Sequence, residues 1–166
     1  MKPAAQPIHS SCLQAIKDLL GPQGYLESEQ DRAPFEVDFR RIHQGQTPLV
    51  ALPQSTEHLS RLMRYCSEQR IGIVPQGGNT SYCGGATPRA GNGEIVVSLR
   101  RMNRIRSLDA LNDSMTADAG CVLETLQEAA LAAERLLPMS LGRKDPARSA
   151  GSFRPMPAAR RCCATA

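Results

Sequence analysis

Apolar residues recur at two different spacings along the chain, and these spacings predict helices that alternate with strands. In three stretches every third or fourth position is apolar, which is the repeat of a helix with one buried face. Short unbroken apolar runs predict buried strands instead. We expect helices over residues 9–20, from Ser55 through Cys66, and over about 122–133. We expect strands at 49–52, 71–74 and 94–99.

Polar residues at the ends of these stretches indicate where the helices begin. Ser10 or Ser11 can cap the first helix, and Ser55 can cap the second, with Glu57 in its first turn. Residues 23–47 are polar with weak periodicity and are expected to run over the surface. The side chains of the second helix that should face the core are Leu59, Leu62, Met63 and Cys66.

The order of the elements favours an α+β fold. Residues 49–74 read as strand, helix and strand, which implies a right-handed crossover and parallel pairing. Two later runs, 104–108 and 114–119, read as an antiparallel pair around a turn at Asn112 and Asp113. A small parallel unit is therefore followed by the start of an antiparallel unit.

Residues 75–88 carry the strongest chemical signal. Two glycine pairs bracket hydroxyl and amide side chains directly after the strand at 71–74. Because glycine has no Cβ, successive backbone N–H groups can point into one concavity that suits an anion such as a pyrophosphate. Asn79, Thr80 and Ser81 can add side-chain donors. Taken alone, such a stretch is more often a glycine-rich surface turn than an anion site.

Other familiar sites are not suggested. The glycines match neither the Gly-x-Gly-x-x-Gly dinucleotide fingerprint nor a Walker A loop with its lysine. The six cysteines form no Cys-x-x-Cys pair and have no histidine at zinc-ligand spacing, so no metal site is predicted. Cys66 is expected in the core, whereas Cys83 within the glycine stretch is either a small neighbour of a ligand or a reactive thiol. The three histidines are isolated and are read as surface or capping residues.

The sequence Pro-Gln-Gly-Gly-Asn-Thr, followed by Gly-Gly-Ala, resembles the pyrophosphate loop of FAD-linked oxidases of the vanillyl-alcohol oxidase and p-cresol methylhydroxylase (PCMH) superfamily. The chain looks most like its D-2-hydroxyglutarate dehydrogenase, D-lactate dehydrogenase and glycolate oxidase group. Asp118–Leu123 and Leu137–Gly142 also read like family segments, and the likeness covers roughly residues 36–142. The resemblance implies the N-terminal part of a PCMH-type FAD-binding domain with FAD as cofactor. The cofactor-binding residues it implies are Pro75, Gln76, Gly77, Gly78, Asn79, Thr80, Ser81, Gly84, Gly85, Pro138, Ser140, Leu141 and Gly142.

The same resemblance implies an FAD-dependent oxidoreductase that moves hydride from a 2-hydroxy acid to the flavin, which carries the redox chemistry. No catalytic residue is expected in this chain, because the family's substrate and metal residues lie in a later domain. We therefore expect weak or absent FAD binding and no turnover by this chain alone. An autonomous FAD- or nucleotide-binding subunit without catalysis is the alternative.

Charge separates the last part of the chain from the rest. The net charge is +4 over 166 residues, but residues 143–166 alone carry +5, so residues 1–142 carry −1. After Gly142 the family would continue with Ala-Glu-Gly-Ser-Cys, whereas this tail is rich in Arg, Ala, Pro, Ser and Cys. Back-translation with one base restored at Gly142 is compatible with the family continuation, which predicts a frameshift. We expect an N-terminal segment at 1–35, a partial FAD-binding domain at 36–142 and a disordered tail at 143–166.

Composition also limits the partners and the location. A basic tail can bind a partner through charge, but it has no aromatic or amide reading surface, so no nucleic-acid function is predicted. No stretch approaches the roughly 18 apolar residues of a membrane span. The residues from Met1 to Pro7 lack the apolar segment of a secretion signal, which predicts a cytoplasmic protein.

Overall fold

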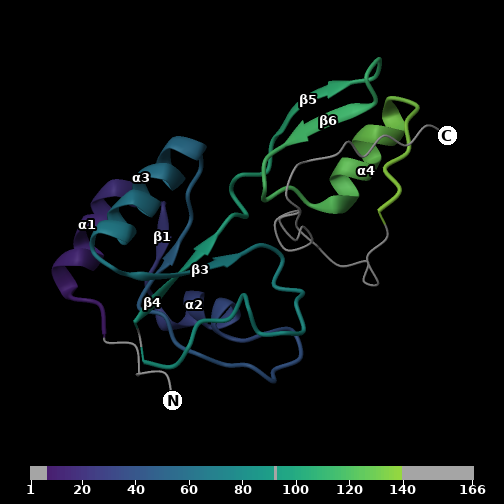
Figure 1. The fold of residues 1–166 in the computed structure, drawn as a ribbon. Coiled ribbons are helices and arrows are strands. Elements are labelled where there is room, and N and C mark those ends of the chain that lie inside the picture. The colour runs from purple at the N-terminus through teal and green to yellow at the C-terminus, as the bar shows by residue number, and fades with distance from the viewer. Residues whose placement is uncertain (1–6, 92, 140–166) are drawn as a thin grey trace.

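The computed structural model describes residues 7–91 and 93–139. These residues form a larger lobe, with a four-stranded sheet between helices, and a smaller lobe with two strands and one helix (Figure 1). The chain passes to the smaller lobe after β4 (Glu94–Ser98). Parallel pairing comes first and antiparallel pairing follows, so the α+β class predicted from the sequence is confirmed.

Strand β4 lies in the middle of the larger sheet and runs parallel to both of its neighbours, β2 (Val50–Ala51) and β3 (Gly72–Gln76). The short β1 (Tyr25–Leu26) pairs antiparallel with the outer side of β2. β2 and β3 are parallel, as the crossover implies, but they do not pair with each other because β4 lies between them. All five residues of β4 are buried, which is why an unbroken apolar run predicts this strand.

Helix α1 (Ser10–Leu20) has the predicted extent, but its cap differs. The ring of His9 accepts a hydrogen bond from the backbone N–H of Ser11, so His9 occupies the cap position rather than Ser10 or Ser11. The Ser11 hydroxyl lies 2.7 Å from the same ring nitrogen. A histidine nitrogen can replace the usual hydroxyl here because the cap needs only an acceptor.

Helix α3 (Thr56–Glu68) begins at the predicted cap, since Ser55 accepts a hydrogen bond from the N–H of His58. Leu62 and Cys66 are fully buried, as predicted, and burial raises the pKa of the Cys66 thiol to about 11. Met63 was expected in the core but is 46% exposed, because it lies at the edge of the apolar stripe. No described helix has both the length and the apolar character needed to cross a bilayer.

Most residues between 23 and 47 are exposed, as predicted, but the sequence did not reveal their regular structure. This part contains β1 and the helix α2 (Glu29–Glu36), which Ser28 caps by accepting from the N–H of Asp31. Apolar periodicity does not reveal α2 because Phe35 is its only buried residue. Pro34 also argues against a helix, yet it lies in the last turn, where few later residues depend on it.

Helices cover both faces of the larger sheet. Alternation along β4 directs Ile95 and Val97 toward α1 and α3. Val96 points to the opposite face, where it packs with Phe35 of α2 and with Val74 of β3. Figure 1 shows α1 and α3 together on one side of the sheet and α2 on the other.

The smaller lobe contains the predicted hairpin and the predicted third helix. Strands β5 (Ile105–Asp109) and β6 (Ser114–Ala117) pair antiparallel, and α4 (Leu123–Ala132) follows. The side chain of Asp109 closes the turn by accepting from two backbone N–H groups. Arg135 binds Asp113 and so fastens the residues after α4 to the hairpin turn.

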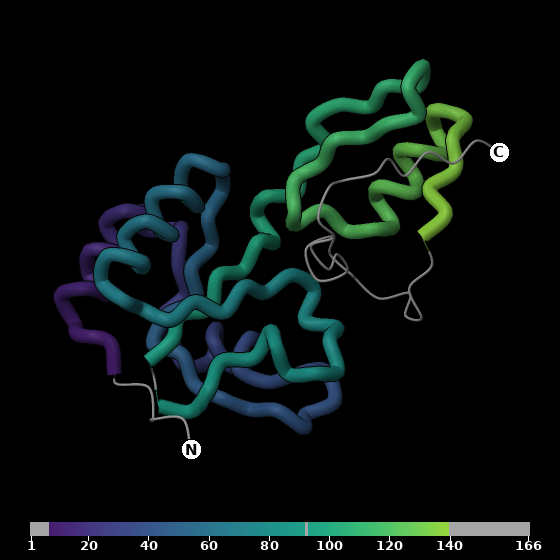
Figure 2. Tube along the Cα trace, in the orientation of Figure 1, coloured from purple at the N-terminus to yellow at the C-terminus, as the bar shows by residue number. Residues whose placement is uncertain are grey.

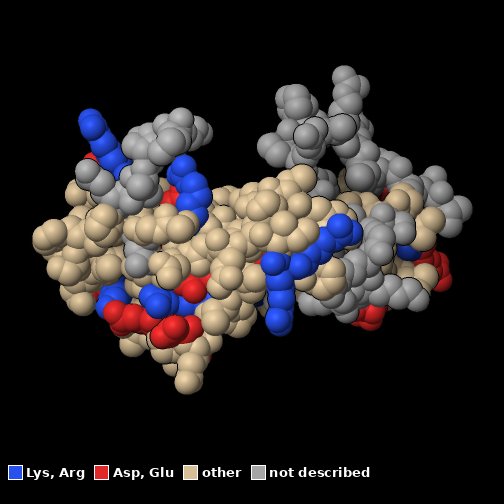
Figure 3. Space-filling model, turned by 90° about the horizontal axis from the view of Figure 1, so that it is seen from below, with Lys and Arg blue, Asp and Glu red and all other residues tan. Residues whose placement is uncertain are grey.

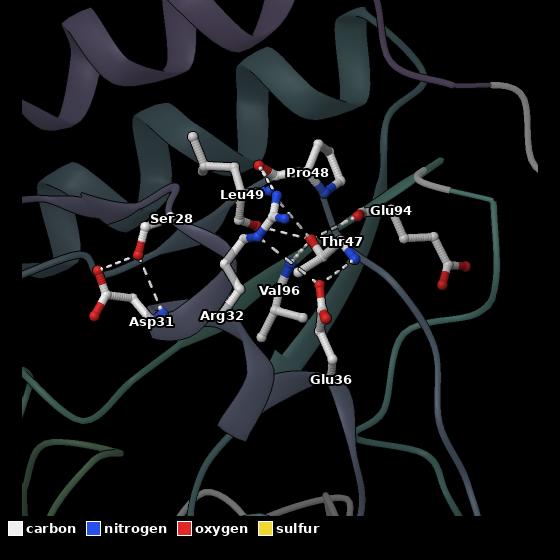
Figure 4. A network of polar contacts seen from close by, with 9 residues as sticks. All are labelled: Ser28, Asp31, Arg32, Glu36, Thr47, Pro48, Leu49, Glu94 and Val96. Atoms are coloured by element: carbon white, nitrogen blue, oxygen red, sulfur yellow. Dashed lines mark hydrogen bonds and ion pairs between the residues drawn. The ribbon is translucent and has the colours of Figure 1, made fainter.

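A buried threonine joins α2, β2 and β4 (Figure 4). The Thr47 side chain is fully buried, and its hydroxyl lies 2.8 Å from the carbonyl oxygen of Leu49 and 2.9 Å from that of Glu94. The backbone N–H of Thr47 donates to Glu36, and the N–H of Val96 donates to the hydroxyl. One hydroxyl therefore connects the residues just before β2 to β4 through buried backbone groups.

We expect Thr47→Val to lower the free energy of unfolding by about 1–3 kcal/mol, because it removes the hydroxyl and the hydrogen bonds that it makes with buried backbone groups. Urea denaturation measures the change. Thr116→Val, at an exposed position of β6, is the matched control and should have little effect. Equal losses from the two variants would contradict the role assigned to Thr47.

Candidate functional site

The glycine loop, residues 75–88, begins inside β3 and leaves the sheet at the edge where β3 and β4 both end. Pro75 and Gln76 are the last residues of the strand rather than the first of the loop, and Gln76 pairs with Ser98. Proline is tolerated there because β3 is an edge strand. Carboxyl ends of parallel strands are the usual place for ligands in open α/β sheets.

A second stretch, the facing segment of residues 35–47, lies against the glycine loop. Figure 2 shows this segment in blue beside the teal loop. The approach is close: a Cβ added at Gly45 would lie 1.7 Å from the carbonyl oxygen of Pro88, and one at Gly84 would lie 2.6 Å from the His43 ring. The N–H of Gln46 donates to the carbonyl of Arg89. The loop therefore has one wall made by residues from a distant part of the chain.

Two amide side chains of the loop are bound to backbone carbonyls. Gln76 is 2% exposed, and its amide nitrogen donates to the carbonyl of Phe35 at 3.0 Å and to that of Ala86 at 2.8 Å. Asn79 has a φ of 54° and donates from its amide to the carbonyl of Val37 at 2.8 Å. Asparagine tolerates this left-handed conformation better than most residues. The amide nitrogens of both side chains therefore donate to the protein's own backbone.

Unlike these side chains, several backbone N–H groups of the loop have no hydrogen-bond partner among the described residues. Within residues 7–91 and 93–139, no hydrogen bond is donated by the backbone N–H groups of Gly78, Asn79, Thr80 or Ser81. The stretch is not a hairpin, because its internal bonds are few, such as that from the N–H of Thr87 to the carbonyl of Gly84. A run of unpaired N–H groups in a glycine-rich turn can bind an anion.

The facing segment is itself a tight turn closed by a buried carboxylate. Asp38 is 2% exposed and accepts from the N–H of His43 at 2.7 Å. Burial opposes ionisation, but hydrogen bonds from the backbone of His43, Ile42 and Arg40 outweigh it and lower the pKa of Asp38. The carboxylate therefore stays charged at neutral pH and holds the turn in shape.

Cationic side chains extend from this turn beside the loop. The guanidinium of Arg40 lies 4.0 Å from the centre of the Tyr82 ring, and Arg41 adopts a φ of 57°. These positive charges favour an anion near the loop. On the face drawn in Figure 3, basic and acidic side chains lie next to each other and uncharged side chains cover much of the remaining described surface.

An ion pair fixes the far end of the loop. Arg89 binds Glu94 through its backbone N–H and its guanidinium, and the Glu94 side chain is largely buried. Burial alone would raise the pKa of Glu94, but the hydrogen bonds and charge of Arg89 lower it. The loop is thus held at both ends, by Gln76 at its start and by Arg89 just after it.

The structure brings together the predicted residues of the loop but not those of the second predicted strip. Gly77 to Ser81, with Gly84 and Gly85, form one continuous turn beside the facing segment. Pro138 is exposed and follows α4 in the smaller lobe, and no hydrogen bond in the described part of the chain joins it to the loop. Ser140, Leu141, Gly142 and the predicted tail lie outside the described residues.

Sequence reasoning missed the facing segment as part of the site. The sequence assigned Asp38 no role in the site, and His43 was read as an isolated surface or capping residue. His43 is indeed exposed, but its ring packs on Gly84. The one signal in the sequence for a tight turn here was that Asp38 and Gly45 lie close together in a polar stretch. Cys83 is exposed, and no group of three or more His, Cys, Asp or Glu among the described residues could hold a metal ion.

Comparison with known proteins identifies relatives for most of the chain. A model of the family described as "FAD binding domain" matches residues 47–154. A probable mitochondrial D-2-hydroxyglutarate dehydrogenase of Oryza sativa subsp. indica is 34% identical over 142 residues, which is 86% of this chain and 25% of that protein. A D-2-hydroxyglutarate–pyruvate transhydrogenase of Saccharomyces cerevisiae is 32% identical over 84% of this chain and 28% of its own length. The chain spans about a quarter of the length of these relatives.

Solved structures share the fold. A p-cresol methylhydroxylase with bound substrate superposes with a TM-score of 0.68 at 20% identity and covers 89% of this chain and 30% of that one. An alkyldihydroxyacetonephosphate synthase gives a TM-score of 0.67 at 19% identity over 80% of this chain and 26% of its own. These identities are low, so the two structures support the PCMH-type fold predicted from the sequence and nothing finer.

Gly84 should be less tolerant of substitution than its neighbour. Its φ is 67°, and an added Cβ would meet the His43 ring, so Gly84→Ala should cost about 1–2 kcal/mol. Gly85→Ala is the matched control, because nothing lies within 4 Å of its added Cβ. Urea midpoints measure both variants. If the two substitutions cost the same, the described contact between the loop and the facing segment is wrong.

Proposed function

This chain belongs to the FAD binding domain family, and from that premise we propose that it forms the FAD-holding part of an FAD-dependent dehydrogenase that acts on 2-hydroxy acids. One observation carries the proposal: the glycine loop presents unpaired backbone N–H groups at the carboxyl edge of a parallel sheet. The names of the rice and yeast relatives support the substrate class, since both names include D-2-hydroxyglutarate.

The residues of the loop fit the diphosphate of FAD in distinct ways. The N–H groups from Gly78 to Ser81 would bind the phosphate oxygens, and the hydroxyls of Thr80 and Ser81 can add donors. Gln76 and Asn79 would contribute through the backbone alone, because their side chains are already bound. Gly77, Gly84 and Gly85 would shape the turn.

Pro138 and residues 140–142 remain a proposed second contact strip for the cofactor. Asp38 and Thr87 each keep a buried side-chain oxygen without a partner among the described residues, which suits a polar ligand at the junction of the loop and the facing segment. When bound, the flavin supplies the acceptor for hydride. The residues of this chain bind and orient it, and we assign no catalytic residue here.

A second candidate is an autonomous FAD- or nucleotide-binding subunit that works beside a catalytic partner. The two helix-covered faces of the larger sheet favour it, because this lobe has its own core on each side. An intact neighbouring gene that encodes the rest of the family domain would support this alternative. A cytoplasmic location stays a prediction, and the rice relative is described as mitochondrial.

We also propose that residues 143–166 are translated out of frame. Their basic composition supports this, although the family match extends to residue 154, beyond Gly142. Nucleotides read across codons 138–166 and downstream should give Ala-Glu-Gly-Ser-Cys and the rest of the family domain after a one-base correction at Gly142. The frameshift is excluded if no such continuation is encoded.

The chain by itself should bind FAD weakly, with a Kd on the order of 100 µM or higher, because the proposed frameshift would remove most of the second strip of contacts to the cofactor. Quenching of flavin fluorescence during titration measures the affinity. ADP, which contains the diphosphate, should compete, whereas riboflavin, which lacks it, should bind less well. Riboflavin binding as tight as that of FAD would refute a diphosphate site, and a chain purified with bound FAD would favour the autonomous subunit.

A further inference from the structure

Two amide side chains of the glycine loop, Gln76 and Asn79, donate their hydrogen bonds to backbone carbonyls of the protein. Alternation along β3 points Gln76 to the same face of the sheet as Val74, which is the face covered by α2. There its amide reaches the carbonyl of Phe35 at the end of α2 and the carbonyl of Ala86 across the loop. An amide has two N–H donors, so both are used. Gln76 thereby bridges the start of the loop, its end and α2.

Asn79 provides a second attachment three residues later. Its left-handed backbone turns the chain, and its amide donates to the carbonyl of Val37. Val37 and Phe35 are neighbours at the end of α2, so both amides bind the same short stretch of the facing segment. The part of the loop between and just after these attachments contains the unpaired N–H groups.

These attachments keep the backbone of the loop in one conformation. Backbone N–H groups in a flexible, glycine-rich loop can pair within the loop or turn into solvent, and a loop that must be reordered binds its ligand less tightly. Here the side chains of Gln76 and Asn79 hold the loop in place, because they bind backbone carbonyls at the end of α2 and across the loop. The N–H groups from Gly78 to Ser81 are then available to bind an anion, and the binding does not have to order the loop first.

We propose that Gln76 and Asn79 are positioning residues whose side chains hold the glycine loop in its anion-binding shape and do not themselves contact the anion. The inference rests on the proposed function, since it names how the same site is organised. It assigns to these two side chains a role different from the direct contact that the sequence suggested.

The test compares variants of the full chain in FAD and ADP binding, urea stability and amide hydrogen exchange. Asn79→Gly removes one attachment and still allows a positive φ, so the fold should survive. Asn112→Gly is its matched control, because Asn112 also donates from its side-chain amide but lies in the hairpin turn of the smaller lobe. Gln76→Met, paired with Gln14→Met, repeats the comparison for the second residue, since Gln14 donates from its side-chain amide to Asp18 within α1.

We expect Asn79→Gly to weaken FAD and ADP binding by about tenfold and by the same factor for both, because the loop must be ordered on binding. Its urea midpoint should stay close to that of Asn112→Gly. ADP at a concentration that saturates the unmodified chain should slow exchange at the amides of residues 78–81, and should fail to do so in Asn79→Gly. Gln76→Met should weaken binding in the same way, and Gln14→Met should not.

Two failures can be told apart. If ADP and FAD leave the amides of residues 78–81 unprotected in the unmodified chain, the proposed function fails and the inference falls with it. If the unmodified chain is protected and Asn79→Gly binds equally well, the positioning role is wrong while the diphosphate site stands. A loss of affinity in Asn112→Gly as large as in Asn79→Gly would also overturn the positioning role.

Discussion

The burial of β4 on both faces is the constraint on which the other features of the larger lobe depend. A strand between two parallel neighbours must offer apolar side chains alternately to each side, and β4 does so with Ile95, Val96 and Val97. Helices α1 and α3 are required on one face and α2 on the other. Each buried CH₂ group contributes about 0.8 kcal/mol, so exposing either face of this strand would cost several kcal/mol.

The same alternation extends from the core to the candidate site. β3 pairs with β4 in register up to Gln76 and Ser98, so the parity that buries Val74 also buries Gln76. A glutamine forced onto the α2 face needs partners, and the carbonyls at the end of α2 and in the loop provide them. The core therefore dictates where the glycine loop is attached.

The facing segment is held in place by polar contacts, whereas the larger sheet is held by apolar packing. Asp38 closes its turn, Thr47 ties it to β2 and β4, and Gly45 allows it to approach the loop closely. Buried polar groups of this kind are costly unless they are paired, and here nearly all of them bind backbone atoms. The site thus depends on hydrogen bonds between stretches that lie about forty residues apart in sequence, as in the bond from Asn79 to Val37.

Periodicity and glycine spacing alone determined the order of the strands and helices other than β1 and α2, the burial of Leu62 and Cys66, and the place of the glycine loop after a strand. These features follow from local patterns, because a buried strand or a helix face imposes its repeat on adjacent residues. Tertiary structure alone decided that β4 lies between β2 and β3, that residues 29–36 form a helix with one buried side chain, and that Met63 stays exposed. It also decided that Gln76 and Asn79 bind backbone carbonyls. Such outcomes depend on which distant segments meet, and no local repeat records that.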